Sequence, residues 1–210
     1  MDAHVHFWDP TQLEYFWLTP NAAPLYRAFL PGEIEPELHA SGVSRVVFVQ
    51  ASHDPRETAW ALALAQRFGW IAAAIGWVDL ESPGVDAKLE HFLTDTRFKG
   101  VRHPLHTEAD TAWLARPAVR RGLAALETKR LLFELVIRPE QLPLVAQTVA
   151  RHPQLSFVLD HLGNPPVEDN HFKTCCVIGL PAREFTVCDG YFEFPLAEIA
   201  LSCLELSYTG

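Results

Sequence analysis

The amino-acid sequence predicts an α/β fold in which parallel strands alternate with helices. Six apolar runs, rich in β-branched and aromatic residues, begin roughly 24 to 43 residues apart, which leaves room for a crossover helix after each one. The runs are nearly continuous rather than alternating, as expected for strands that are buried on both faces. The predicted strands cover residues 2–7, 45–51, 71–80, 98–105, 131–138 and 155–161.

Helix signals lie between these runs. Asp54 is a candidate N-cap, Pro55 fits the first helical position and Glu57 fits the third, so a helix is predicted from there to Phe68, with Gly69 as its stop. Apolar residues at helical spacing indicate two further helices. Their buried faces are Val119, Leu123 and Leu126 in one, and Leu142, Val145, Ala146 and Val149 in the other.

Alternating strands and helices fit either a (β/α)8 barrel or an open doubly wound sheet. No GxGxxG motif and no P-loop follows any predicted strand, so the sequence gives no support to nucleotide binding. Polar side chains gather instead at the C-terminal ends of the strands, where barrel enzymes build their sites. They are His4, His6, Gln50, His53, Asp79, Arg102, His103, His106, Arg138, Asp160 and His161.

Composition narrows the class of protein. The chain has 210 residues, of which 49% are hydrophobic and 20% charged, and this suits a single packed domain. A net charge of −9 with no basic cluster argues against a nucleic-acid partner. No run of 18 apolar residues occurs and the N-terminus lacks the pattern of a secretory signal, so we expect a cytoplasmic protein with no membrane association.

The first predicted strand carries two histidines. His4 and His6 are two residues apart, so both side chains are expected on the same face of the strand. His161 ends the sixth strand, and in a closed barrel it would converge on the same point. Three histidines suit zinc or a similar divalent ion such as manganese, which would lower the pKa of bound water and polarise a carbonyl. The same imidazoles would also suit a site that grips an oxyanion without metal.

Three further residues are candidates for substrate binding: Gln50, Arg102 and Asp160. Arginine binds carboxylates through paired hydrogen bonds, and an amide can donate to a substrate oxygen. A carboxyl group at the end of an apolar strand needs a partner or a site, although a simple polar strand terminus remains an open alternative for Asp160. No serine elbow is present and all four cysteines follow residue 167, so no nucleophile is indicated.

Five segments, in order, resemble the motifs of the amidohydrolase-related (amidohydrolase 2) family. Their sequences are DAHVHFWD at 2–9, VFVQA at 47–51, IGWVDL at 75–80, KGVRH at 99–103 and VLDHLGNPP at 158–166. The similar branch is that of fuconolactonases, rhamnonolactonases and 2-pyrone-4,6-dicarboxylate lactonases. The resemblance implies a TIM-barrel hydrolase of the metal-dependent type that acts on a small-molecule lactone, although some members of this branch work without metal. It also implies that His4, His6 and His161 are the catalytic or metal-binding histidines.

The resemblance ends near residue 167. The family pattern continues to an eighth strand whose aspartate is the expected general base, and no such segment occurs here. Residues 168–210 hold seven acidic and only two basic residues, so the composition changes at the same point. We therefore expect a partial barrel of about six βα units over 1–167 and a divergent tail over 168–210. A splice variant, a frameshift or an error in the gene model would each explain this pattern.

Three functions stay open from sequence. The first is a lactone hydrolase, active or inactive in this form. The second is a decarboxylase of the same fold, in which Arg102 would hold the substrate carboxylate. The third is a non-catalytic isoform that competes for a partner. Lactone hydrolysis releases acid, whereas decarboxylation releases carbon dioxide, so these products distinguish the two enzymes. The oligomeric state is not predicted.

Overall fold

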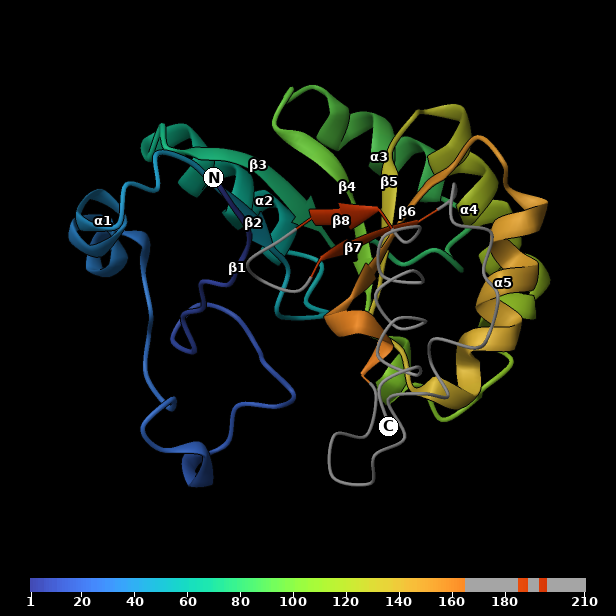
Figure 1. The fold of residues 1–210 in the computed structure, drawn as a ribbon, viewed down its shortest axis with the longest axis horizontal. Helices are drawn as coiled ribbons and strands as arrows, with labels where there is room; N and C mark the ends of the chain where they lie inside the picture. Colours follow the sequence, from blue (N-terminus) through green and yellow to red (C-terminus); the bar gives the residue numbers. More distant parts are fainter. Residues whose placement is uncertain (165–184, 189–192, 196–210) are drawn as a thin grey trace, which may run out of the picture. The chain divides into compact units, whose positions relative to one another are not determined.

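The computed structural model describes residues 1–164, 185–188 and 193–195. The chain divides into two compact units. Met1–Asp79 and Gly84–Arg102 form the first unit, and Leu80–Pro83 and His103–Gly210 form the second. Both units contain parallel strands joined by helices (Figure 1).

The first unit follows the order β1-β2-β3-β4, and each neighbouring pair of strands is parallel. Helix α2 packs against β3. The sheet is apolar because strand β2 buries Val46, Phe48 and Val49 completely. The elements are β1 (Asp2–Val5), α1 (Pro31–Ala40), β2 (Val46–Val49), α2 (Glu57–Arg67), β3 (Ile71–Gly76), α3 (Val85–Leu93) and β4 (Phe98–His103), whose last residue belongs to the second unit.

The second unit continues the alternation. Strands β5, β6 and β7 are parallel neighbours, and β8 pairs antiparallel with β7. The apolar faces predicted for α4 and α5 are buried as expected, except that Ala146 on α5 is only half-buried. The elements are α4 (Pro117–Thr128), β5 (Leu132–Leu135), α5 (Leu142–Arg151), β6 (Ser156–Asp160), β7 (Phe185–Cys188) and β8 (Glu193–Pro195).

The strand order excludes the doubly wound sheet that the sequence left open. A doubly wound sheet reverses its strand order at a switch point. Here the order follows the sequence within each unit, β1 to β4 and then β5 to β7. Sequential parallel strands with intervening helices are typical of the (β/α) barrel.

The observed strands are shorter than the predicted runs, and the difference is mostly at their C-terminal ends. Strand β3 ends at Gly76 rather than at residue 80. The hydroxyl of Thr58 accepts from the backbone N–H of Trp77 at 2.9 Å and donates to its carbonyl at 2.8 Å. The backbone of Trp77 therefore bonds to α2 instead of extending the strand ladder. The apolar residues up to 80 lie beyond the end of β3.

The predicted start of α2 is also wrong. The helix begins at Glu57 with Arg56 as its N-cap, two residues later than a cap at Asp54 allows. Asp54 instead forms a turn in which its carboxylate accepts from the N–H of Arg56 at 2.9 Å and its carbonyl accepts from the N–H of Glu57 at 3.0 Å. The side chain of Glu57 does not complete a capping box, since it bonds elsewhere.

The tail was predicted to lie outside the family pattern, and two short strands in it were not predicted. Strand β7 pairs with β6 in parallel, from Phe157 opposite Phe185 to Asp160 opposite Cys188. Two apolar stretches of the tail, at 177–180 and 199–206, lie outside the described residues. Among the helices that are described, none has both the length and the apolar composition needed to cross a bilayer.

Candidate functional site

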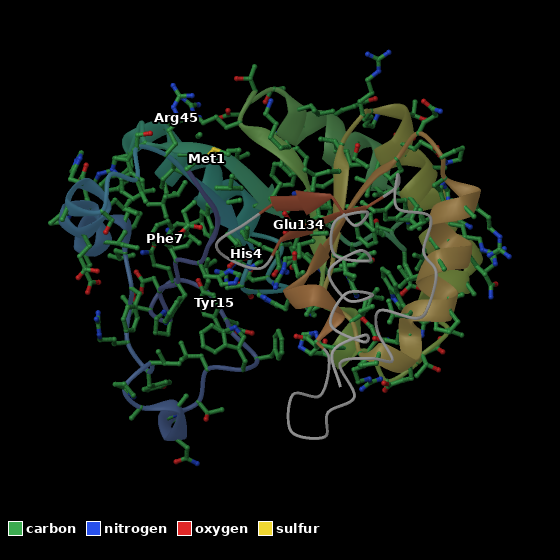
Figure 2. All side chains as sticks on the ribbon, viewed as in Figure 1. Met1, His4, Phe7, Tyr15, Arg45 and Glu134 are labelled. Atoms are coloured by element: carbon green, nitrogen blue, oxygen red, sulfur yellow. The ribbon has the colours of Figure 1, made fainter. Side chains whose placement is uncertain are left out.

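The side chains of His4, on β1, and of His6, which follows directly after the end of β1 at Val5, are in contact (Figure 2 marks His4). Their Nε2 atoms are 3.1 Å apart, and the two rings are perpendicular with centroids 4.8 Å apart. This contact follows from the period of two along a strand, which places both imidazoles on one face.

A backbone carbonyl determines which ring nitrogen of His6 carries a proton. The Nδ1 atom of His6 lies 2.8 Å from the carbonyl oxygen of Val49, at the end of β2. A carbonyl oxygen can only accept, so Nδ1 carries the proton and donates it. In the neutral ring, Nε2 therefore presents a lone pair toward His4.

The histidine pair fits a divalent metal. Two nitrogen ligands of one tetrahedral zinc, each at about 2.0–2.1 Å from the ion, lie roughly 3.3 Å apart, close to the separation found here. A metal-binding histidine commonly donates its second nitrogen to a carbonyl or carboxylate, as His6 does. The residues present are thus compatible with metal at His4 and His6, and equally with a shared proton between them.

Gln50 and Arg102 form the second polar pair of the first unit. Gln50 follows β2 and is 2% exposed, and Arg102 lies on β4 and is 7% exposed. The guanidinium Nη1 donates to the backbone carbonyl and to the side-chain oxygen of Gln50, both at 3.1 Å. The Gln50 amide in turn donates to the carbonyl of Ser52 at 3.2 Å. Because Gln50 directly follows Val49, this pair lies next to the strand end that holds His6.

Glu57 binds the backbone of the loop that follows β2. It was not identified as a site residue from the sequence. Its carboxyl group is completely buried and accepts from the backbone N–H groups of Ala51 (3.1 and 3.2 Å) and Ser52 (3.0 Å). Burial raises the pKa of Glu57 to about 8, although the two amides and the charge of Arg102 act in the opposite direction. A glutamate in the first turn of a predicted helix has an ordinary explanation as a cap, so sequence gave no separate signal for it.

Four ring-bearing side chains lie at or beside the loop that follows β2. The ring of Phe16, 57% exposed, lies 5.0 Å from that of His53, which stacks on Trp77 at 5.6 Å and 18°. Trp17 donates its indole N–H to the carbonyl of Ala51 at 2.7 Å.

The remaining candidates lie in the second unit. Asp160 ends β6 with a completely buried side chain. His161 follows it in a left-handed conformation (φ 53°) and is exposed. A left-handed backbone is unfavourable for a residue with a Cβ, and such residues concentrate at functional sites. The proposed set of His4, His6 and His161 is divided between the two units, so its convergence stays a prediction.

His103 and His106 follow Arg102 in sequence but belong to the second unit. The Nε2 atom of His103 pairs with Glu108 at 2.8 Å, and its ring stacks on Trp113 with centroids 3.9 Å apart. The partners of the His103 ring in these contacts, Glu108 and Trp113, belong to the second unit as His103 does.

Sequence comparison decides the family. A model described as amidohydrolase matches residues 1–175. The chain belongs to the amidohydrolase family. This confirms the resemblance found from the five segments.

Two curated relatives, from Burkholderia ambifaria and Burkholderia multivorans, are both named L-fucono-1,5-lactonase. Each is 34% identical to this chain, over 167 and 170 residues respectively. The match covers 80% of this chain and 58% of the first relative's length, or 57% of the second's. The chain therefore spans less than two thirds of the length of these two curated relatives.

Solved structures confirm the barrel-type fold. An amidohydrolase from Burkholderia multivorans with bound zinc has a TM-score of 0.80 and 28% identity, covering 97% of this chain and 77% of the other. A probable 2-pyrone-4,6-dicarboxylic acid hydrolase from Acinetobacter baumannii has a TM-score of 0.74 at 19% identity, covering 98% and 78%. A 2,6-dihydroxybenzoate decarboxylase has a TM-score of 0.56 at 11% identity, covering 82% and 74%. The last two show a shared fold and nothing finer.

Proposed function

We propose that this chain hydrolyses a sugar lactone, or forms the histidine-bearing part of a protein that does. The observation that carries the proposal is the pairing of His4 with His6 beside the Gln50–Arg102 pair, all within one unit. The names of the two curated relatives support a 1,5-lactone as the substrate class. No specific observation favours the decarboxylase alternative, since those neighbours share only the fold.

In this proposal the histidines act on the carbonyl oxygen of the lactone. As water adds to the carbonyl carbon, negative charge develops on that oxygen, and hydrogen bonds or a cation placed there lower the barrier. His4, on β1, and His6, directly after β1, supply this stabilisation, and His161 is proposed as the third such group. A zinc or manganese ion held by them would act as a Lewis acid and as a source of activated water.

Substrate binding falls to Gln50 and Arg102, with Asp160 proposed as a further contact. Cleavage of the ring C–O bond gives a hydroxy acid, so the site must accommodate a new carboxylate. Arg102 is suited to that group because a guanidinium binds carboxylate oxygens in pairs. The expected general base of the family lies on an eighth strand that this sequence does not match, and the proposal assigns no base to this chain.

The test is hydrolysis of L-fucono-1,5-lactone, followed by acid release in weak buffer with the uncatalysed rate subtracted. The proposal expects hydrolysis above background and a loss of about 100-fold or more in His6→Asn, since removal of one charge-stabilising group has effects of that size. His91→Asn, at an exposed position on α3, is the matched control and should retain the rate. Equal rates in His6→Asn and the natural chain would contradict the proposal.

A second arm tests the metal. After dialysis against a chelator, the metal-dependent form of the proposal expects the rate to fall and to recover with added zinc or manganese. An unchanged rate would assign carbonyl polarisation to the imidazoles alone. Carbon dioxide release from an aromatic or sugar carboxylate, with no lactone hydrolysis, would favour the decarboxylase instead.

A further inference from the structure

We propose that Glu57 is a positioning residue for the Gln50–Arg102 pair, and that it sets the direction in which this pair meets the lactone. The inference rests on the proposed function for the identity of the ligand. Its geometric part stands on contacts within the first unit alone.

The first step concerns the peptide between Gln50 and Ala51. A trans peptide is planar, so its N–H and C=O point in opposite directions. Glu57 accepts from the N–H of Ala51. The carbonyl of Gln50 is thereby directed away from Glu57, and it is this carbonyl that accepts from Arg102 at 3.1 Å.

The next peptide repeats the arrangement. Glu57 accepts from the N–H of Ser52 at 3.0 Å, which directs the carbonyl of Ala51 to the opposite side. That carbonyl accepts from the indole N–H of Trp17 at 2.7 Å. One buried carboxyl group therefore orients two consecutive peptides, and through them a guanidinium and a tryptophan.

The Gln50 side chain closes the network. Its amide donates to the carbonyl of Ser52, while its oxygen accepts from Arg102. The ladder bond from the N–H of Gln50 to the carbonyl of Ile75, at 2.9 Å, fixes the residue at the end of β2. Glu57 contacts the loop after β2 at Ala51 and Ser52, and the start of this loop at Gln50 is already fixed by the sheet. A substitution at Glu57 is therefore expected to change the orientation of the loop peptides without displacing β2.

The burial of Glu57 argues for a specific role. A completely buried carboxyl group is unfavourable unless its hydrogen bonds compensate. Both oxygens of this carboxyl group accept from the two converging N–H groups, whereas a glutamine offers only one oxygen and would place its NH2 against one of them. Glu57→Gln preserves the volume and disturbs only this match.

The experiment measures Glu57→Gln in the full chain with L-fucono-1,5-lactone. We expect KM to rise about tenfold and kcat to change less than threefold, because Arg102 and Gln50 bind the substrate and are misaligned by the substitution. Leu62→Ala, buried on the same helix, is the control for general destabilisation and should leave KM within twofold.

A double-mutant cycle with Arg102→Ala distinguishes positioning from mere structural support. If Glu57 acts through Arg102, the Glu57→Gln substitution should change KM less than twofold once Arg102 is removed. Independent effects, with KM multiplied in the double variant, would overturn the proposal.

A third measurement needs no activity. In NMR spectra, the side-chain amide of Gln50 and the Nε–H of Arg102 should shift in Glu57→Gln and not in Leu62→Ala. Shifted signals without lactone hydrolysis by the natural chain would sink the proposed function and leave the positioning role intact. Unshifted signals with lactone hydrolysis would overturn the positioning role and leave the function intact.

Discussion

Two loops at strand ends, one in each unit, are held by a buried polar side chain at the start of the following helix. After β2 it is Glu57, and after β5 it is Gln141, which is 4% exposed. Gln141 accepts from the N–H of Arg138 at 2.8 Å and donates to the carbonyl of Leu105 at 3.0 Å. Each side chain matches its loop: the carboxyl group meets two N–H groups, and the amide meets one N–H and one C=O.

The two loops differ in the partners of the backbone carbonyl groups that the buried side chain itself does not bind. The amide of Gln141 bridges the carbonyl of Leu105 and the backbone N–H of Arg138, so it joins the loop after β5 to the loop after β4. Glu57 takes only N–H groups, which leaves both carbonyls directed to the other side, toward Arg102 and Trp17. The first arrangement stabilises the fold, and the second also presents side chains at the strand end.

The largest effect is expected for Gln141→Glu. The new carboxylate would face the carbonyl of Leu105 in a buried place, which should lower the free energy of unfolding by about 3–5 kcal/mol at neutral pH. A protonated carboxyl group can donate as the amide does, so the loss should decrease as the pH falls toward about 4. Urea unfolding at several pH values measures both effects.

The matched control for this prediction is Gln147→Glu, the same substitution at an exposed position of α5. It should change stability by less than about 0.5 kcal/mol. A loss in Gln141→Glu that is small, or that does not depend on pH, would show that the contact with Leu105 does not require a donor.

At pH 4.5 and below, Glu57→Gln is expected to have an intermediate effect and to lower the free energy of unfolding by about 1–3 kcal/mol, because one N–H group loses its acceptor. The pKa of Glu57 is raised from 4.5 to about 8, so the folded protein holds this proton more tightly than the unfolded chain. The contribution of Glu57 is thus complete below pH 4.5 and is lost as the pH rises to about 8, at up to about 1.4 kcal/mol per pH unit.

The check is the difference in unfolding free energy between the natural chain and Glu57→Gln, followed from pH 4.5 to 9. Taking a difference removes the contribution of other groups that titrate in this range. Glu37→Gln, at an exposed position of α1, controls for the substitution itself. A difference that rises with pH would mean that the amides outweigh burial.

The smallest effect compares two buried threonines. Thr58 bonds twice to the backbone of Trp77, across two elements, whereas Thr148 donates only to Leu144 in its own helix at 2.8 Å. Thr58→Val should lower stability by about 1–2 kcal/mol and Thr148→Val by less than about 0.5 kcal/mol. Equal losses in urea unfolding would show that the Thr58 bonds have no role beyond packing.

Several features of this molecule were predictable from sequence because they depend on local periodicity. The six strands of the βα repeat and the buried faces of α4 and α5 follow from apolar spacing, and the family follows from five short motifs. The period of two placed His4 and His6 on one face, and the structure brings them together.

Other features depend on contacts between distant segments. The end of β3 is set by Thr58, which lies 19 residues before its partner Trp77. The role of Glu57 was hidden because the pattern around Asp54 resembles a helix cap, and only the folded loop reveals its true acceptor geometry. Strands β7 and β8 were missed because their sequences fit no family motif.

The central claim is that the loop after β2 serves substrate binding while the loop after β5 serves the fold. The most direct test is KM for L-fucono-1,5-lactone in Glu57→Gln and in Gln141→Glu, measured where both variants are fully folded. The account predicts that KM rises about tenfold in Glu57→Gln and stays within twofold of the natural value in Gln141→Glu. An equal change in both variants, or no change in Glu57→Gln, would contradict it.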